Sequence, residues 1–211
     1  MNFLAHCLLA AQAKPEDEAL TEDLIAGAVL GDFVKGAVPS GWPITLQTGV
    51  RLHRRIDAHS NQMQGIRTSC NRFPKTLRRF APIFVDVIAD HCLALAWTGH
   101  HHRALTEFSE RCYRVISAHA HRVDERQQRY IDWMIEDDLL ANYTSFDVMQ
   151  RGLYSITRRL RREELNGQLA DFVRSSLPAL QADFLEYFPD LVSHAQTWVA
   201  RESRPSVQED G

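Results

Sequence analysis

Two acids and a histidine lie in the most apolar stretch of the chain, APIFVDVIADHCLALAW. Asp86 and Asp90 are four residues apart, and His91 follows Asp90 directly. A carboxylate without a partner is costly to bury, so it normally has a cation, a metal ion or a hydrogen-bond network beside it. We therefore favour a functional centre in this stretch. Oxygen and nitrogen ligands without thiolates would suit Mn, Fe, Mg or Zn.

His53 and Asp57 form a second candidate pair, in the sequence HRRID. Residues four apart share one face of a helix, so both side chains can reach one ion or one phosphate. Pairs with this spacing are also common on helix surfaces as ordinary ion pairs. The spacing alone leaves both interpretations open.

His6 and Asp32 are single ionisable residues within apolar sequence. His6, in NFLAHCLLA, fits a core histidine bonded to a backbone carbonyl as well as a ligand. Asp32 follows Gly27 and Gly31, and a glycine inside a helix costs about 1 kcal/mol and suggests close backbone approach. The segment indicates either tight packing, with Asp32 near a helix end, or a carboxylate ligand with Lys35 nearby.

The elements that must position these residues are helices. No proline occurs from Ile83 to Leu177, which suits long helices, and strand-like alternation is weak. We expect one all-α domain over residues 1–200 and a frayed tail over 201–211. The predicted helices cover residues 2–13, 21–35, 44–60, 79–98, 103–118, 144–164 and 167–187, with a further helical segment over 130–143.

The composition is that of an ordinary globular protein. Hydrophobic residues make up 45% and charged residues 24% of 211 residues, which excludes wholesale disorder. No apolar run reaches the ~18 residues of a membrane span, and no P-loop, dinucleotide or G-x-S-x-G motif is present. The four cysteines form no C-x-x-C pair. A secretory signal requires a basic segment at its start, and no Lys or Arg precedes Lys14. We therefore expect a reducing, cytoplasmic location.

Basic residues are concentrated although the formal net charge is −3. Residues 51–79 hold eight Lys or Arg against one acid, Asp57, and residues 158–162 hold four further arginines. A solvated helix face explains many such runs, but this local imbalance favours an acidic partner or a phosphate ligand. Nucleic-acid binding is not expected, because few aromatic residues are interleaved with the basic ones.

The candidate residues fall in motifs that resemble the acyl carrier protein phosphodiesterase family, also called acyl carrier protein hydrolase. The motifs are Asn2-Phe3-Leu4-Ala5-His6, Gly31-Asp32-Phe33-Val34-Lys35-Gly36, His53-Arg54-Arg55-Ile56-Asp57, and Asp86 followed by Asp90-His91. The sequence FLEYFPD, residues 184–190, resembles the aromatic-proline segment near the family's C-terminus. The resemblance covers nearly the whole chain, to about residue 197.

This resemblance implies a reaction, a metal and a fold. The family hydrolyses the phosphodiester that joins 4′-phosphopantetheine to a serine of holo acyl carrier protein, which yields apo carrier protein and the free prosthetic group. It is described as manganese-dependent and all-helical, a divergent relative of the HD-type phosphohydrolases. Asp32 matches the family's essential aspartate in the GDF-like motif.

The chain departs from the HD signature in one respect. That signature has a histidine followed directly by an aspartate, whereas the adjacent pair here has the reverse order, Asp90-His91. On the resemblance we expect Asp32, Asp90 and His91 to hold a divalent ion, most simply Mn²⁺, with help from His6. The full set from which ligands are drawn is His6, Asp32, His53, Asp57, Asp90 and His91.

Catalytic and binding roles follow from the same resemblance. With Asp32, we expect His53 or Asp57 to orient the attacking water or to protonate the leaving serine oxygen. Arg54 and Arg55 could steady the phosphate, since a guanidinium offers a planar fork of donors. Because acyl carrier proteins are acidic, the basic stretch could dock one. The residues assigned to substrate or partner binding are Arg54, Arg55, Lys35, Arg78 and Arg79.

Two other functions stay open on the sequence. A different HD-like phosphohydrolase, acting on a nucleotide or another small phosphate ester, would use the same metal centre. A non-catalytic helical binding module would keep the fold but show neither stoichiometric metal nor turnover.

Overall fold

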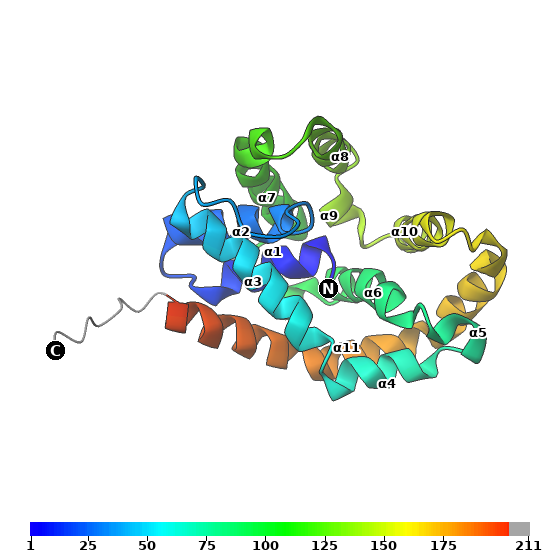
Figure 1. Ribbon diagram of the computed structural model, residues 1–211. Coiled ribbons are helices and arrows are strands. Elements are labelled where there is room, and N and C mark those ends of the chain that lie inside the picture. Colours follow the sequence, from blue (N-terminus) through cyan, green and yellow to red (C-terminus); the bar gives the residue numbers. More distant parts are fainter. Residues whose placement is uncertain (203–211) are drawn as a thin grey trace.

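Helix α1 (Phe3–Ala13) lies at the centre of the fold. Every residue of α1 except Gln12 is buried, which is typical of a helix packed on all sides. It packs against α2 (Glu18–Leu30), α3 (Ile44–Ser60), α6 (Ala81–Leu95) and α11 (Asn166–Glu202). In this computed structural model, which describes residues 1–202, the N-terminal end of α1 lies near the middle of the molecule (Figure 1).

The other helices extend the structure around this centre (Figure 1). They are α4 (Gln64–Arg72), α5 (Lys75–Arg78), α7 (Leu105–His119), α8 (Glu125–Glu136), α9 (Leu139–Asn142) and α10 (Phe146–Arg159), with the 3-10 turns η1 (Trp97–Gly99), η2 (Ala120–Arg122) and η3 (Glu163–Leu165). Residues 1–202 contain no β-strand, so the predicted all-α class is confirmed.

Helices α2 and α3 pack with their backbones in contact. A Cβ built on Gly27 would meet the carbonyl oxygen of Leu46 and lie 2.8 Å from the Cα of Gly49. A Cβ on Gly49 would lie 2.8 Å from the carbonyl oxygen of Leu24. Gly27 therefore marks tight helix packing, which was one of the two interpretations of this segment of the sequence. This packing brings the end of α2 against the middle of α3.

Several helix boundaries differ from the prediction, although α3 covers 44–60 as expected. Helix α2 begins at Glu18 rather than at residue 21, because Asp17 caps it by accepting a hydrogen bond from the backbone of Leu20 at 3.0 Å. It ends at Leu30 rather than at residue 35, so Asp32 lies in the turn beyond it. Helix α10 ends at Arg159 rather than at residue 164, and Arg161 has a left-handed φ of 56°.

The largest difference concerns the C-terminal helix. The sequence predicts an end at residue 187, before Pro189, but α11 continues through Pro189 to Glu202. Proline lacks an N–H and disfavours a helix interior. Here burial of Phe188, Leu191 and Val199 on the inner side of α11 outweighs that local preference. The predicted tail covers residues 201–211, but Arg201 and Glu202 still belong to α11, and residues 203–211 lie outside the described residues.

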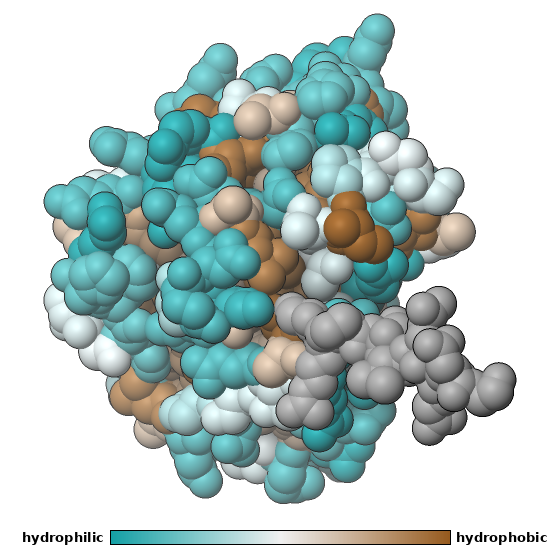
Figure 2. Space-filling model, turned by 90° about the vertical axis from the view of Figure 1, so that its left-hand side faces the viewer, coloured by the Kyte–Doolittle hydropathy of each residue, from teal (hydrophilic) through white to brown (hydrophobic). Residues whose placement is uncertain are grey.

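The outer surface is largely polar. On the face shown in Figure 2, hydrophilic residues dominate and the hydrophobic ones form small separate patches. Within residues 1–202, no helix combines the length and apolar character needed to cross a bilayer. The four cysteines are all unpaired thiols.

Candidate metal centre

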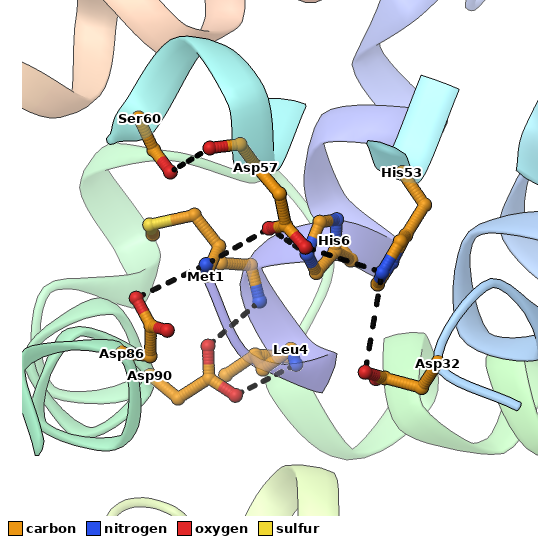
Figure 3. A network of polar contacts seen from close by, with 10 residues as sticks. Met1, Leu4, His6, Asp32, His53, Asp57, Ser60, Asp86 and Asp90 are labelled. Carbon is orange, nitrogen blue, oxygen red and sulfur yellow. Dashed lines mark hydrogen bonds and ion pairs between the residues drawn. The ribbon is translucent and has the colours of Figure 1, made fainter. Parts of the chain in front are cut away.

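Two helices and one turn bring four of the predicted side chains together (Figure 3). Helix α1 contributes His6, and α3 contributes His53 and Asp57 one turn apart. Asp32 comes from the turn after α2. The close packing of α1, α2 and α3 therefore joins residues that are up to 51 positions apart in the chain.

The carboxylate of Asp57 contacts both imidazoles. Its Oδ1 is 3.1 Å from His6 Nε2, and its Oδ2 is 3.3 Å from His53 Nε2. The two imidazole rings stack with centroids 4.0 Å apart. One ligand atom from each of His6, His53 and Asp57 lies within 4.8 Å of the others, and no other such group occurs in residues 1–202.

Both histidines are buried and have unused hydrogen-bonding atoms. Nδ1 of His6 and Nδ1 of His53 have no partner among the described residues, which is costly for buried polar atoms unless a ligand or water completes them. Burial lowers the pKa of His6, and it lowers the pKa of His53 to about 4. The imidazoles are therefore neutral near pH 7, the form that binds a metal ion. Two neutral imidazoles with a carboxylate fit Mn, Fe or Zn.

The amino group of Met1 adds a cation beside Asp57. Its nitrogen lies 3.1 Å from Oδ1 of Asp57 and 3.1 Å from Oδ1 of Asp86 (Figure 3). Although burial opposes it, the pairing with Asp86 and Asp57 raises the pKa of this amino group to about 10. Burial alone would raise the pKa of Asp57, but His6 and the ammonium hold it well below the usual range. Asp57 is therefore ionised.

Sequence analysis missed this ammonium group, because a backbone amine has no side-chain signal. The spacing of Asp86 and Asp90 was the available indication. Both carboxylates lie on the side of α6 that faces the start of α1, where one meets the amino group and the other meets backbone N–H groups.

Asp32 and Asp57 are open to solvent to nearly the same extent, with side chains 41% and 39% exposed. Oδ1 of Asp32 lies 3.9 Å from His53 Nε2. Loss of hydration raises the pKa of Asp32, while His53 and Lys35 oppose this rise. Gly31 makes the approach of the two elements possible, because a Cβ there would lie 2.6 Å from Cγ of His53.

Asp90 and His91 do not join the cluster, in contrast to the ligand set drawn from the resemblance. Asp90 accepts hydrogen bonds from the backbone of Leu4 at 2.8 Å and of Ala5 at 2.9 Å. It therefore satisfies the free N–H groups at the start of α1. Nδ1 of His91 lies 2.6 Å from the carbonyl oxygen of Tyr143, and its ring is buried. Packing and capping explain this part of the apolar helix.

The predicted binding residues lie on several elements. Arg54 donates to the carbonyl of Val34 at 2.9 Å, which fastens the turn that carries Asp32. Lys35 donates to the carbonyl of Asp32 at 2.8 Å. The other three have these positions: Arg55 is exposed on α3, Arg78 donates to the carbonyls of Asn71 and Phe73, and Arg79 lies over the ring of Phe80.

Comparison with known proteins assigns the family. The family model described as acyl carrier protein phosphodiesterase matches residues 1–191. This chain belongs to the acyl carrier protein phosphodiesterase family. The matched region includes every residue of the candidate metal centre. The family name describes a phosphoric diester hydrolase, so the resemblance inferred from the motifs is confirmed.

Curated relatives carry the same name. A protein called acyl carrier protein phosphodiesterase from Escherichia coli O6:H1 is 30% identical over 203 residues, which are 92% of this chain and 97% of that protein. The namesake from Serratia proteamaculans is 28% identical over 198 residues, or 93% of this chain and 98% of that protein. A third, from Shigella boydii serotype 18, is 30% identical over 203 residues. No solved structure matches this chain.

Proposed function

We propose that this member of the family hydrolyses the phosphodiester between 4′-phosphopantetheine and a serine of holo acyl carrier protein. The observation that carries the proposal is the cluster of His6, His53 and Asp57 within a chain that the family model matches over residues 1–191. Water attacks phosphorus, the bond to the serine oxygen breaks, and that oxygen takes a proton. The products are apo carrier protein and the free prosthetic group.

We propose His6, His53 and Asp57 as the residues that hold a divalent ion, with Asp32 on the open side. Their fit rests on two neutral imidazoles and an ionised carboxylate whose ligand atoms lie within 4.8 Å of one another. When bound, such an ion polarises the phosphate and lowers the pKa of a bound water. Mn²⁺ is the ion that we propose first, and Fe²⁺, Mg²⁺ and Zn²⁺ are alternatives for the same donors.

Asp32 is placed to move a proton at the reacting phosphate. Its side chain is 41% exposed, and Nε2 of His53 lies 3.9 Å from Asp32 and 3.3 Å from Asp57. We propose that Asp32 orients the attacking water, takes its proton and gives a proton to the leaving serine oxygen, while His53 helps to hold the ion. Arg54 supports this arrangement through the carbonyl of Val34.

We further propose that exposed basic residues near this centre dock the acidic carrier protein in the cytoplasm. Lys35 and Arg55 are exposed on the turn after α2 and on α3, the two elements that carry Asp32 and His53. Such docking weakens with salt, because exposed charges are screened. The KM for carrier protein should therefore rise with ionic strength. A KM that stays flat from low to high salt would rule out this docking mode.

Intact-mass spectrometry of holo acyl carrier protein tests the proposed reaction. Incubation with this protein and Mn²⁺ should remove the mass of phosphopantetheine, and EDTA should prevent the loss. A nucleotide panel run in parallel separates a nucleotide phosphohydrolase from the proposed enzyme. If neither holo carrier protein nor any nucleotide were hydrolysed, and the protein bound no metal, the result would instead support a non-catalytic binding module.

A further inference from the structure

Four aromatic side chains form a continuous run beside the candidate metal centre. Tyr130 on α8 is the hub, with ring centroids 5.9 Å from Phe3, 6.0 Å from Phe33 and 5.4 Å from Trp133. Phe3 is buried at the start of α1, and Phe33 is partly buried in the turn after α2. The run therefore leads from the elements that carry the cluster to the surface of α8.

The outer two rings are exposed. Tyr130 is 38% and Trp133 is 45% exposed, whereas Ile131 and Met134 on the other side of α8 are fully buried. Ile131 and Met134 therefore pack α8 against the hydrophobic core, and Tyr130 and Trp133 are not part of that core. Exposed aromatic side chains that adjoin one another are a common mark of a binding surface. We call Tyr130 and Trp133 the aromatic shelf.

The aromatic shelf adjoins the catalytic carboxylate. Phe33 directly follows Asp32 in the chain, and its ring contacts Tyr130. Gln127, one turn before Tyr130 on α8, donates to the carbonyl of Phe33 at 3.4 Å. Burial first, and then the negative charge of Asp32, raises the pKa of Tyr130 to about 12. The aromatic shelf therefore lies beside the turn that carries Asp32.

We propose that the aromatic shelf of Tyr130 and Trp133 binds the pantetheine arm of the substrate and so selects phosphodiesters that carry it. This inference rests on the proposed function, which places the phosphate at Asp32. One substituent of that phosphate is a protein serine and the other is a flexible arm with methyl and amide groups. Aromatic faces suit such an arm, since they offer apolar area at little cost in conformational entropy.

The size of the aromatic shelf favours the arm over the carrier protein itself. A stable protein interface buries about 800 Å² on each partner, and two half-exposed rings offer only a small part of that area. A small-molecule site, in contrast, is built from a few aromatic and apolar side chains with a few polar groups at one end. The cluster of His6, His53, Asp57 and Asp32 supplies that polar end.

Direct binding measurements separate the aromatic shelf from the rest of the site. Calorimetric titration with 4′-phosphopantetheine and, separately, with inorganic phosphate, both with Mn²⁺ present, should be made on wild type and Trp133→Ala. We expect Trp133→Ala to weaken phosphopantetheine binding by roughly fivefold or more and to leave phosphate binding unchanged.

Leu95→Ala is the matched control. Leu95 is 48% exposed on α6, so Leu95→Ala removes a similarly exposed apolar side chain outside the aromatic shelf. It should bind phosphopantetheine like wild type, with a melting temperature that verifies folding for each variant. Equal phosphopantetheine affinity for wild type and Trp133→Ala, or an equal loss with phosphate, would overturn the proposal. Turnover of holo carrier protein by wild type is measured separately, so a failure of the proposed function is seen independently.

Discussion

Asp57 has three partners that the sequence presents in very different ways. His53 is four residues away on the same helix, and this pair was predictable from spacing alone. His6 and the amino group of Met1 are more than 50 residues away and meet Asp57 only through the packing of α1 on α3. Local spacing therefore indicated half of the site, and tertiary contacts supplied the rest.

The role of Asp90 could not be read from the sequence. A buried carboxylate needs a cation or hydrogen-bond donors beside it, and the sequence prediction was that a metal ion stabilises Asp90. The structure supplies two backbone N–H groups at the start of α1 instead, which a sequence pattern does not reveal. Burial raises the pKa of Asp90 to about 7, and these two hydrogen bonds oppose the rise.

Asp32→Ala should abolish most activity while the fold persists. The side chain is exposed at the open side of the cluster and makes no hydrogen bond that holds helices together. We expect a loss of at least about 100-fold in kcat/KM, typical for removal of a proton-transfer or water-orienting group. Thermal melting should match wild type, and Asp171→Ala, at an exposed acid on α11, is the control. Near-normal activity of Asp32→Ala would remove Asp32 from the mechanism.

Asp90→Asn should reduce stability, because an amide replaces a carboxylate that accepts two backbone hydrogen bonds. One acceptor is lost, and a buried NH₂ group gains no partner, so we expect a loss of about 1–3 kcal/mol in the free energy of unfolding. Urea unfolding measures this change. Metal affinity of the folded variant should equal that of wild type. A selective loss of metal at unchanged stability would show that Asp90 is a ligand after all.

At the scale of elements, the sequence predicted helices well and their ends less well. Gly27 of α2 correctly indicated close packing, because only a missing side chain permits backbone contact between α2 and α3. The continuation of α11 through Pro189 was not predictable, since local preference disfavours it and only burial against neighbouring helices favours it. Helices α4 and α5 were missed because their helical pattern is short and largely polar.

Gly27→Ala should destabilise the protein strongly. The added methyl group would meet the backbone of Leu46 and Gly49, which cannot move without separating α2 from α3. We expect a loss of at least about 2 kcal/mol in the free energy of unfolding. Gly41→Ala is the matched control, since nothing lies within 4 Å of a Cβ at Gly41. Urea unfolding that gave equal stabilities for these two variants would contradict the described packing.

At the scale of the whole molecule, α11 holds distant parts of the chain together. It packs against α1, α3, α4 and α6. Asp183 on α11 accepts two hydrogen bonds from Arg72 at 2.7 Å and one from Ser69 at 2.9 Å, both on α4. Burial alone would raise the pKa of Asp183, but these donors hold it below its usual value.

This pairing predicts a stability difference that depends on pH. A carboxyl group whose pKa is lower in the folded state stabilises the fold above the unfolded pKa of about 3.9. The contribution is then lost as pH falls through the folded pKa. Urea unfolding should show wild type more stable than Asp183→Asn at pH 7, with a gap that narrows below about pH 4. A gap that stayed constant between pH 7 and pH 3 would contradict the ionised pairing.

Metal binding tests the central claim most directly. Equilibrium dialysis against Mn²⁺ should be made on wild type, Asp57→Asn, His53→Gln and the control Asp171→Asn, with turnover of holo carrier protein measured on the same samples. We predict stoichiometric Mn²⁺ and EDTA-sensitive turnover for wild type and the control, and a parallel loss of both in the two cluster variants that remain folded. Full Mn²⁺ binding and full turnover in folded Asp57→Asn and His53→Gln would contradict a metal centre built on His6, His53 and Asp57.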